Sequence, residues 1–181
     1  MEAEISVPDG IQASLERGVL KIKGPRGEQA RHFANPTIGI RLEDGLIRLV
    51  YESKKEKKGT KAVVGTWEMH IRNMISGAQK GWEARLKIVY SHFPVRFSVE
   101  GKEVLIQNFL GEKKARKARI NGNAKVDVVK DEVIVTGVAK EEVGQTAANI
   151  ELATRVTGRD RRVFQDGCYI VEKPRPQIRL L

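Results

Sequence analysis

The stretch Val95-Arg-Phe-Ser-Val-Glu-Gly-Lys-Glu-Val-Leu-Ile106 has the pattern of a β-hairpin. Apolar residues alternate with polar ones on either side of Glu100-Gly101-Lys102, which supplies the turn. The same pattern occupies residues 11–24, where Arg17-Gly18 turns. A Gly-Glu pair follows each hairpin, at positions 27–28 and again 84 residues later at positions 111–112. The chain therefore contains an internal repeat.

Each half continues with a second hairpin and then a helix. The hairpins span residues 38–51, with a Glu43-Asp44-Gly45 turn, and residues 125–138. Apolar residues spaced by three and four predict helices at about 60–76 and 140–157, capped by Gly77 and Gly158 in the left-handed conformation. The sequence thus predicts an α+β fold of two tandem similar domains, each an antiparallel sheet with one main helix packed on it, arising from an internal duplication.

The predicted organisation has three parts. Residues 1–81 form an N-terminal α+β repeat, and residues 82–92 form a connecting strand or linker. Residues 93–181 form a C-terminal α+β repeat that carries a basic RNA-binding surface and a proline-containing tail. Pro174 and Pro176 favour an extended tail that cannot pair along its length.

The charge is unevenly distributed. The 181 residues carry a net charge of +10 with a sequence pI of about 9.8, which indicates a polyanionic partner. Residues 1–84 contribute +3 and residues 85–181 contribute +7. The single cysteine, Cys168, precludes an internal disulfide and fits a reducing cytoplasm. No apolar run approaches the length of a membrane span, so we expect a soluble cytoplasmic protein.

Two segments of the second half are dense in cations. Residues 108–120, Asn108-Phe-Leu-Gly-Glu-Lys-Lys-Ala-Arg-Lys-Ala-Arg-Ile120, are expected to be a charged loop held by a folded body. Its cations are Lys113, Lys114, Arg116, Lys117 and Arg119; those near the end of the second helix are Arg155, Arg159, Arg161 and Arg162. Such segments are either solvated faces or sites for a phosphate backbone. Few aromatic residues accompany them, which favours folded, helical RNA over stacked single strands.

No residue pattern indicates catalysis. His32, His70 and His92 are scattered, without metal-ligand spacing, and Cys168 is expected to be a buried structural thiol. Gly24-Pro-Arg-Gly27 lacks the spacing of a phosphate-binding P-loop. We therefore expect no enzyme, no cofactor, no metal, no small-molecule substrate and no membrane contact.

The segment Gly158-Arg-Asp-Arg-Arg-Val-Phe-Gln-Asp-Gly-Cys-Tyr-Ile170 resembles the C-terminal signature of the sixth large-subunit ribosomal protein family, in its archaeal and eukaryotic branch. The matching positions are Arg159, Arg162, Phe164, Asp166, Gly167, Tyr169 and Ile170. Cys168 departs from the signature because it stands where an aliphatic residue is usual. Residues 108–112 and the tandem duplication also resemble this family.

The resemblance implies a structural component of the large ribosomal subunit near the stalk base. There the C-terminal domain binds 23S-type rRNA close to the sarcin–ricin loop and the translation-factor site, beside neighbouring large-subunit and stalk-base proteins. The RNA-facing residues carried over are those of the two basic segments, with Lys173 and Arg175 of the tail. We assign Phe164 and Tyr169 to the core. The alternative is a non-ribosomal RNA-binding or protein-interaction module.

Overall fold

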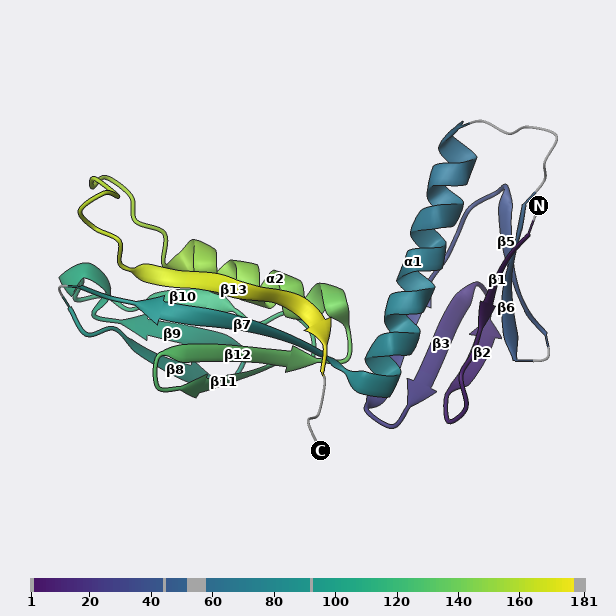
Figure 1. Cartoon of the computed structure of the whole chain (residues 1–181), viewed down its shortest axis with the longest axis horizontal. Helices are drawn as coiled ribbons and strands as arrows, with labels where there is room; N and C mark the ends of the chain where they lie inside the picture. The colour runs from purple at the N-terminus through teal and green to yellow at the C-terminus, as the bar shows by residue number, and fades with distance from the viewer. Residues whose placement is uncertain (1, 44, 52–57, 92, 178–181) are drawn as a thin grey trace. The chain divides into compact units, whose positions relative to one another are not determined.

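The computed structural model describes residues 2–43, 45–51, 58–91 and 93–177 (Figure 1). The chain divides into two compact units, residues 1–81 and 82–181. Asp44 of the predicted turn and His92 lie outside the described residues.

The first unit combines two three-stranded antiparallel sheets with one helix. The sheets have the orders β2-β3-β4 and β1-β6-β5. The elements are β1 (Glu2–Ser6), β2 (Gln12–Glu16), β3 (Val19–Gly24), β4 (Gly27–His32), β5 (Ile38–Glu43), β6 (Leu46–Tyr51) and α1 (Lys58–Lys80). Leu20, Ile47 and Ile71 come from both sheets and from α1, and all three are fully buried in one core.

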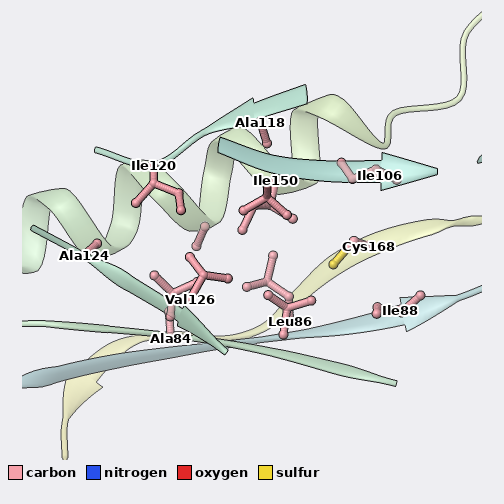
Figure 2. Close-up of a cluster of buried hydrophobic side chains, with 14 of the residues drawn as sticks. Ala84, Leu86, Ile88, Ile106, Ala118, Ile120, Ala124, Val126, Ile150 and Cys168 are labelled. Atoms are coloured by element: carbon pink, nitrogen blue, oxygen red, sulfur yellow. The ribbon is translucent and has the colours of Figure 1, made fainter. Parts of the chain in front are cut away.

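The second unit repeats this plan and adds a strand. Its sheets have the orders β10-β9-β8 and β11-β12-β7-β13. The elements are β7 (Trp82–Val89), β8 (Arg96–Glu100), β9 (Glu103–Gln107), a 3-10 turn (Phe109–Gly111), β10 (Arg116–Arg119), β11 (Lys125–Val129), β12 (Glu132–Gly137), α2 (Lys140–Ala153) and β13 (Gly167–Pro176). Figure 2 shows Ile106, Ala118 and Ile150 on one side of the core, facing Leu86 and Val126 on the other.

The two units share one topology, which confirms the predicted tandem α+β duplication. The sheet β2-β3-β4 corresponds to β8-β9-β10, the hairpin β5-β6 to β11-β12, and α1 to α2. β1 pairs antiparallel with β6, and β7 pairs antiparallel with β12, so β7 is the counterpart of β1. No strand among the described residues of the first unit corresponds to β13.

The stretch 82–92, expected to connect the units, begins the second unit. β7 lies between β12 and β13 in the four-stranded sheet. Its alternate residues Trp82, Ala84, Leu86 and Ile88 are buried in the core of that unit. The expected strand is therefore present as β7, and it is an internal strand of the sheet of the second unit.

Both helix ends differ from the prediction. α1 continues past Gly77 to Lys80 and ends at Gly81, whose φ is +78°. The extra turn is held because Ala78 is fully buried and its carbonyl accepts a hydrogen bond from Arg26 N (3.0 Å). α2 ends at Ala153 instead of residue 157, so Gly158 does not cap it and lies in the following loop.

Three strands carry too weak an apolar pattern to have been predicted, namely β1, β4 and β10. β4 reads Gly-Glu-Gln-Ala-Arg-His, and it forms because it pairs along its length with β3. The expectation that residues 108–120 are a loop throughout was wrong. Residues 116–119 form β10, which pairs with β9 from Arg116↔Ile106 to Arg119↔Glu103.

The C-terminal tail also pairs further than expected. β13 continues through Pro174 to Pro176, which lies opposite Trp82 of β7. Register shifts between Ile170 and Glu172 and between Glu172 and Arg175 accommodate the segment. An edge strand tolerates proline because its outward N–H groups need no strand partner.

Candidate nucleic-acid interface

Arg116 joins the two basic segments. Its Nη1 donates hydrogen bonds to the carbonyl oxygens of Ala153 (3.0 Å), the last residue of α2, and of Arg155 (3.1 Å), two residues later. The loops before β10 and after α2 therefore lie at the same end of the second unit (Figure 1). The two cation-dense segments therefore meet in the folded chain.

Arg116 is itself committed to the fold. Its Nε and Nη2 donate to the Glu112 carboxylate at 2.9 and 2.6 Å, and its guanidinium lies 4.4 Å from the Phe109 ring centroid. Bonds to Glu112, Ala153 and Arg155 occupy four of the five N–H donors of an arginine. The same contact, aided by Arg159, holds the pKa of Glu112 below its usual value. Arg116 positions the loops more than it faces solvent.

The turn before the lysines is tightly built. Asn108 and Leu110 have φ values of +58° and +52°, a conformation that costs a bulky residue such as leucine free energy. Burial of Phe109 and Leu110 offsets this cost, and Asn108 Nδ2 donates to Pro94 O (3.1 Å). In the first unit a tight turn at Gly24↔Gly27 joins β3 directly to β4. The longer connection from residue 108 to 115 distinguishes the second unit.

The loop after α2 is ordered by two carboxylates. Asp160 accepts hydrogen bonds from Arg162 N (2.9 Å) and from the Arg162 guanidinium, and these bonds lower the pKa of Asp160. Asp166 is buried and accepts from Ser91 N at 2.6 Å, which ties the loop to the end of β7. The Arg159 guanidinium lies 4.8 Å from the Phe164 ring centroid. The arginines thus project from a fixed loop.

In the signature Asp166-Gly167-Cys168-Tyr169, the glycine is packed against the tyrosine ring. A Cβ on Gly167 would lie 3.0 Å from Cζ of Tyr169, closer than ordinary van der Waals contact, so the ring would have to shift to make room for it. The Tyr169 hydroxyl donates to Gln165 O (3.1 Å). Tyr169 is 46% exposed, so its assignment to the core was wrong, whereas Phe164 packs partly buried against the core. Cys168 is buried, as predicted.

Two residues that the sequence analysis missed cover the free edge of β13. Thr154 Oγ1 accepts from Cys168 N (2.9 Å), and Glu151 Oε1 accepts from Ile170 N (3.0 Å). Glu151 lies in the last turn of α2 and Thr154 just after it, and they reach N–H groups two residues apart on the strand. The sequence offers no signal for these contacts, because a threonine and a glutamate at a helix end are ordinary surface residues.

Exposed cations gather where the two loops meet. We call this set the basic end: Lys113, Lys114, Arg155, Arg159, Arg161 and Arg162. Lys117 and Arg119 alternate with buried Ala118 on β10 and lie on the opposite face of that strand from Arg116. Lys117 forms an ion pair with Glu103 (2.8 Å), which raises the pKa of Lys117.

The structure does not bring Lys173 and Arg175 to the basic end. β13 runs antiparallel to β7 from Gly167↔Val89 to Pro176↔Trp82, which places Arg175 roughly 20 Å from the start of the strand. Arg175 pairs there with Glu172 (2.6 Å). These two cations would contact a different part of any ligand.

The described residues contain no group of His, Cys, Asp and Glu side chains placed to hold a metal ion. None of the helices described is long and apolar enough to cross a membrane. The chemistry that the basic end supports is the binding of a polyanion.

Comparison with known proteins agrees with this geometry. A sequence model of the family described as Ribosomal protein L6 matches residues 7–81 and again residues 93–167. A protein named Large ribosomal subunit protein uL6 from Methanocella arvoryzae is 50% identical over 171 residues, which cover 94% of this chain and 96% of that protein. Similar proteins of the same name come from Halobacterium salinarum (47% identity, 94% and 95% covered) and Archaeoglobus fulgidus (46% identity, 96% and 90% covered).

Proposed function

The chain belongs to the ribosomal protein L6 family, and from this membership we propose that it is a structural, non-catalytic component of the large ribosomal subunit. In this role it binds 23S-type rRNA through the basic end of its second unit. The observation that carries the proposal is the pair of hydrogen bonds from Arg116 to Ala153 O and Arg155 O, which unites two basic loops in one surface.

Charge neutralisation supplies the affinity. All six cations of the basic end are exposed, and the like charges repel one another until phosphates neutralise them. Arginine suits this task because its planar guanidinium binds phosphate oxygens in a bidentate manner. The contacts to phosphate fix the protein on a folded RNA by shape rather than by sequence.

The loops are organised before RNA arrives. Asp160 holds Arg162, Asp166 anchors the loop to Ser91, and Arg116 binds the carbonyl oxygens of Ala153 and Arg155 at the end of α2. A preorganised surface loses less conformational entropy on binding than a free basic tail. The protein therefore stabilises one arrangement of the rRNA segments that it contacts.

A more precise position of the protein on the large ribosomal subunit is suggested by the signature at residues 158–170. We propose that the basic end lies near the stalk base, by the sarcin–ricin loop and the translation-factor site, in cytoplasmic ribosomes. Lys117, Arg119, Lys173 and Arg175 face other directions and contact neighbouring rRNA segments. Residues 1–84, with a net charge of only +3, are suited to neighbouring large-subunit and stalk-base proteins.

The test is the salt dependence of binding to a transcript of 23S-type rRNA. The triple variant Lys113→Ala/Lys114→Ala/Arg161→Ala should bind more weakly, and the slope of log K against log salt should fall by roughly 1 for each lost phosphate contact. The matched control, Lys87→Ala/Lys102→Ala/Lys125→Ala, removes three exposed cations of the same unit outside the basic end. Equal loss of slope in both variants would show that only total charge matters and would refute an interface at the basic end.

A second measurement tests the assembly. Stoichiometric presence of the chain in salt-washed large subunits is the expected result. Presence only in light, ribosome-free fractions would contradict the ribosomal role while leaving RNA binding intact.

A further inference from the structure

A pocket of about 270 Å³ opens beside the basic end. It lies between the last turn of α2, the loop that follows and the start of β13. Leu152, Val156, Phe164 and Tyr169 supply its apolar and aromatic lining, and buried Cys168 contributes a thiol. Pockets for drug-sized ligands begin at about 300 Å³, so this one suits a single small ring system.

The aromatic groups of the pocket are held in place. The Tyr169 hydroxyl donates to Gln165 O, and its ring lies against Gly167. Phe164 has the Arg159 guanidinium 4.8 Å from its ring centroid. Burial, together with the nearby Glu151 carboxylate, raises the pKa of Cys168 to about 12, so the thiol is neutral at pH 7. The apolar part of the pocket therefore carries no charge of its own.

The charged residues that line the pocket are both positive and negative. Arg155 and Arg161 line the pocket and are exposed to solvent. Glu151 also lines it, and its Oε1 accepts from Ile170 N. A carboxylate has about four acceptor sites, so Glu151 retains the capacity to accept from a ligand N–H group.

We propose that this pocket takes one unpaired nucleobase of the rRNA, with the phosphates on either side of that nucleotide bound by Arg155 and Arg161. The proposal rests on the rRNA-binding function above and adds a contact that neutralisation of charge does not supply. Unpaired bases in RNA loops and bulges are recognised by stacking on aromatic side chains and by hydrogen bonds to their edges.

The carboxylate selects among occupants. A phosphate inside the pocket would be repelled by Glu151, whereas the exocyclic amino group of adenine, guanine or cytosine donates to it. Uracil has no amino group and can donate only its ring N3–H, so we expect it to bind more weakly than the other three bases.

The direct test uses the full chain with labelled methyl groups and the four nucleoside monophosphates as probes. Saturable NMR shifts at Leu152 and Val156 with AMP, GMP or CMP, and smaller ones with UMP, are expected. Equal shifts with ribose 5-phosphate would assign an anion site and overturn the proposal. No shift with any nucleotide, or shifts only with an acidic leucine-containing peptide, would also overturn it.

The second test blocks the pocket with a larger side chain and measures binding to RNA. Leu152→Trp places an indole at the pocket mouth on an exposed position of α2, and Val129→Trp is the control on an exposed position of β11. Neither changes the charge. Leu152→Trp should weaken binding to the 23S-type transcript roughly 5- to 150-fold, the range for loss of one stacked base, without altering the salt slope. Val129→Trp should bind like the wild type.

The two proposals fail in different ways. If the wild type binds the transcript with the expected salt slope and Leu152→Trp binds equally well, the pocket proposal is wrong and the rRNA-binding proposal stands. If the wild type binds the transcript no better than an unrelated RNA duplex, the rRNA-binding proposal itself fails.

Discussion

Thr154 Oγ1 accepts a hydrogen bond from Cys168 N at 2.9 Å, across the junction between α2 and β13. Thr154 is 2% exposed and lies just beyond the helix. Its hydroxyl provides an acceptor for an outward-facing N–H group of the edge strand β13. The same contact holds the loop that carries the arginines.

Thr154→Val should destabilise the second unit by about 1–3 kcal/mol, because the Cys168 N–H is then buried without its acceptor. The measurement is the free energy of unfolding in urea. Thr157→Val, at an exposed threonine of the same loop, is the control and should lie within about 0.5 kcal/mol of the wild type. Equal effects of the two changes would mean that the hydroxyl of Thr154 has no special role.

Arg116→Ala should cost about 1–3 kcal/mol of stability, since the carbonyls of Ala153 and Arg155 and the Glu112 carboxylate all lose a charged donor. Arg119→Ala, three residues later on an exposed position, should cost much less. Denaturant unfolding of the two variants gives the comparison. A larger loss at Arg119 would contradict the assignment of Arg116 as the residue that joins the loops.

The contribution of Arg116 to the free energy of unfolding should depend on pH. Its hydrogen bond lowers the pKa of Glu112 below 4.5, so the stabilisation is present above pH 4.5 and is lost as the pH falls through the lower folded value. The stability difference between wild type and Arg116→Ala should therefore shrink as the pH is lowered from about 5 through the depressed pKa of Glu112. A difference that stays constant over this range would show that Glu112 contributes nothing to it.

Gly167→Ala should destabilise the second unit by roughly 0.5–1.5 kcal/mol, because the added methyl group pushes the half-exposed Tyr169 ring away from its preferred position. In a double-mutant cycle, Tyr169→Ala should remove most of the cost of Gly167→Ala. Additive effects of the two substitutions would place the cause elsewhere than in this contact.

Substitution by alanine at two glycines of the first unit should change the stability in opposite directions. A Cβ on Gly24 would lie 2.6 Å from the Ala78 carbonyl oxygen, a backbone atom that cannot move alone, so Gly24→Ala should lower the thermal midpoint sharply. Gly65 lies inside α1 with nothing within 4 Å of the added carbon. Gly65→Ala should stabilise the protein by about 0.5–1 kcal/mol. Thermal unfolding of both variants checks the pair, and a stabilising Gly24→Ala would refute the close approach of β3 and α1.

The hairpins and the helices were predictable because their signals are local. Residues 12–24 carry alternating apolar positions around a glycine turn, and the stripe of α1 recurs every three or four residues. β4 and β10 have no such signal, since their registers come from pairing with β3 and β9. The helix ends were wrong for the same reason, because Ala78 and Thr154 are fixed by partners distant in sequence.

The candidate site was predictable in composition but not in arrangement. The density of lysine and arginine at residues 113–119 and 155–162 is visible in the chain. That Arg116 turns inward while its neighbours stay exposed follows from the alternation of β10, which depends on β9. Lys173 and Arg175 could be placed only once β13 was seen to run back along β7.

β13 has a consequence for the order in which the chain folds. Every strand of the first unit precedes α1, so that unit can complete its core once residue 81 has left the ribosome that synthesises it. The second unit opens with β7 and closes with β13 on that same strand, so its sheet spans nearly the whole unit in sequence. Such non-local pairing is slow to form. We therefore expect the first unit to fold during synthesis and the second, with its basic end, only after β13 is released.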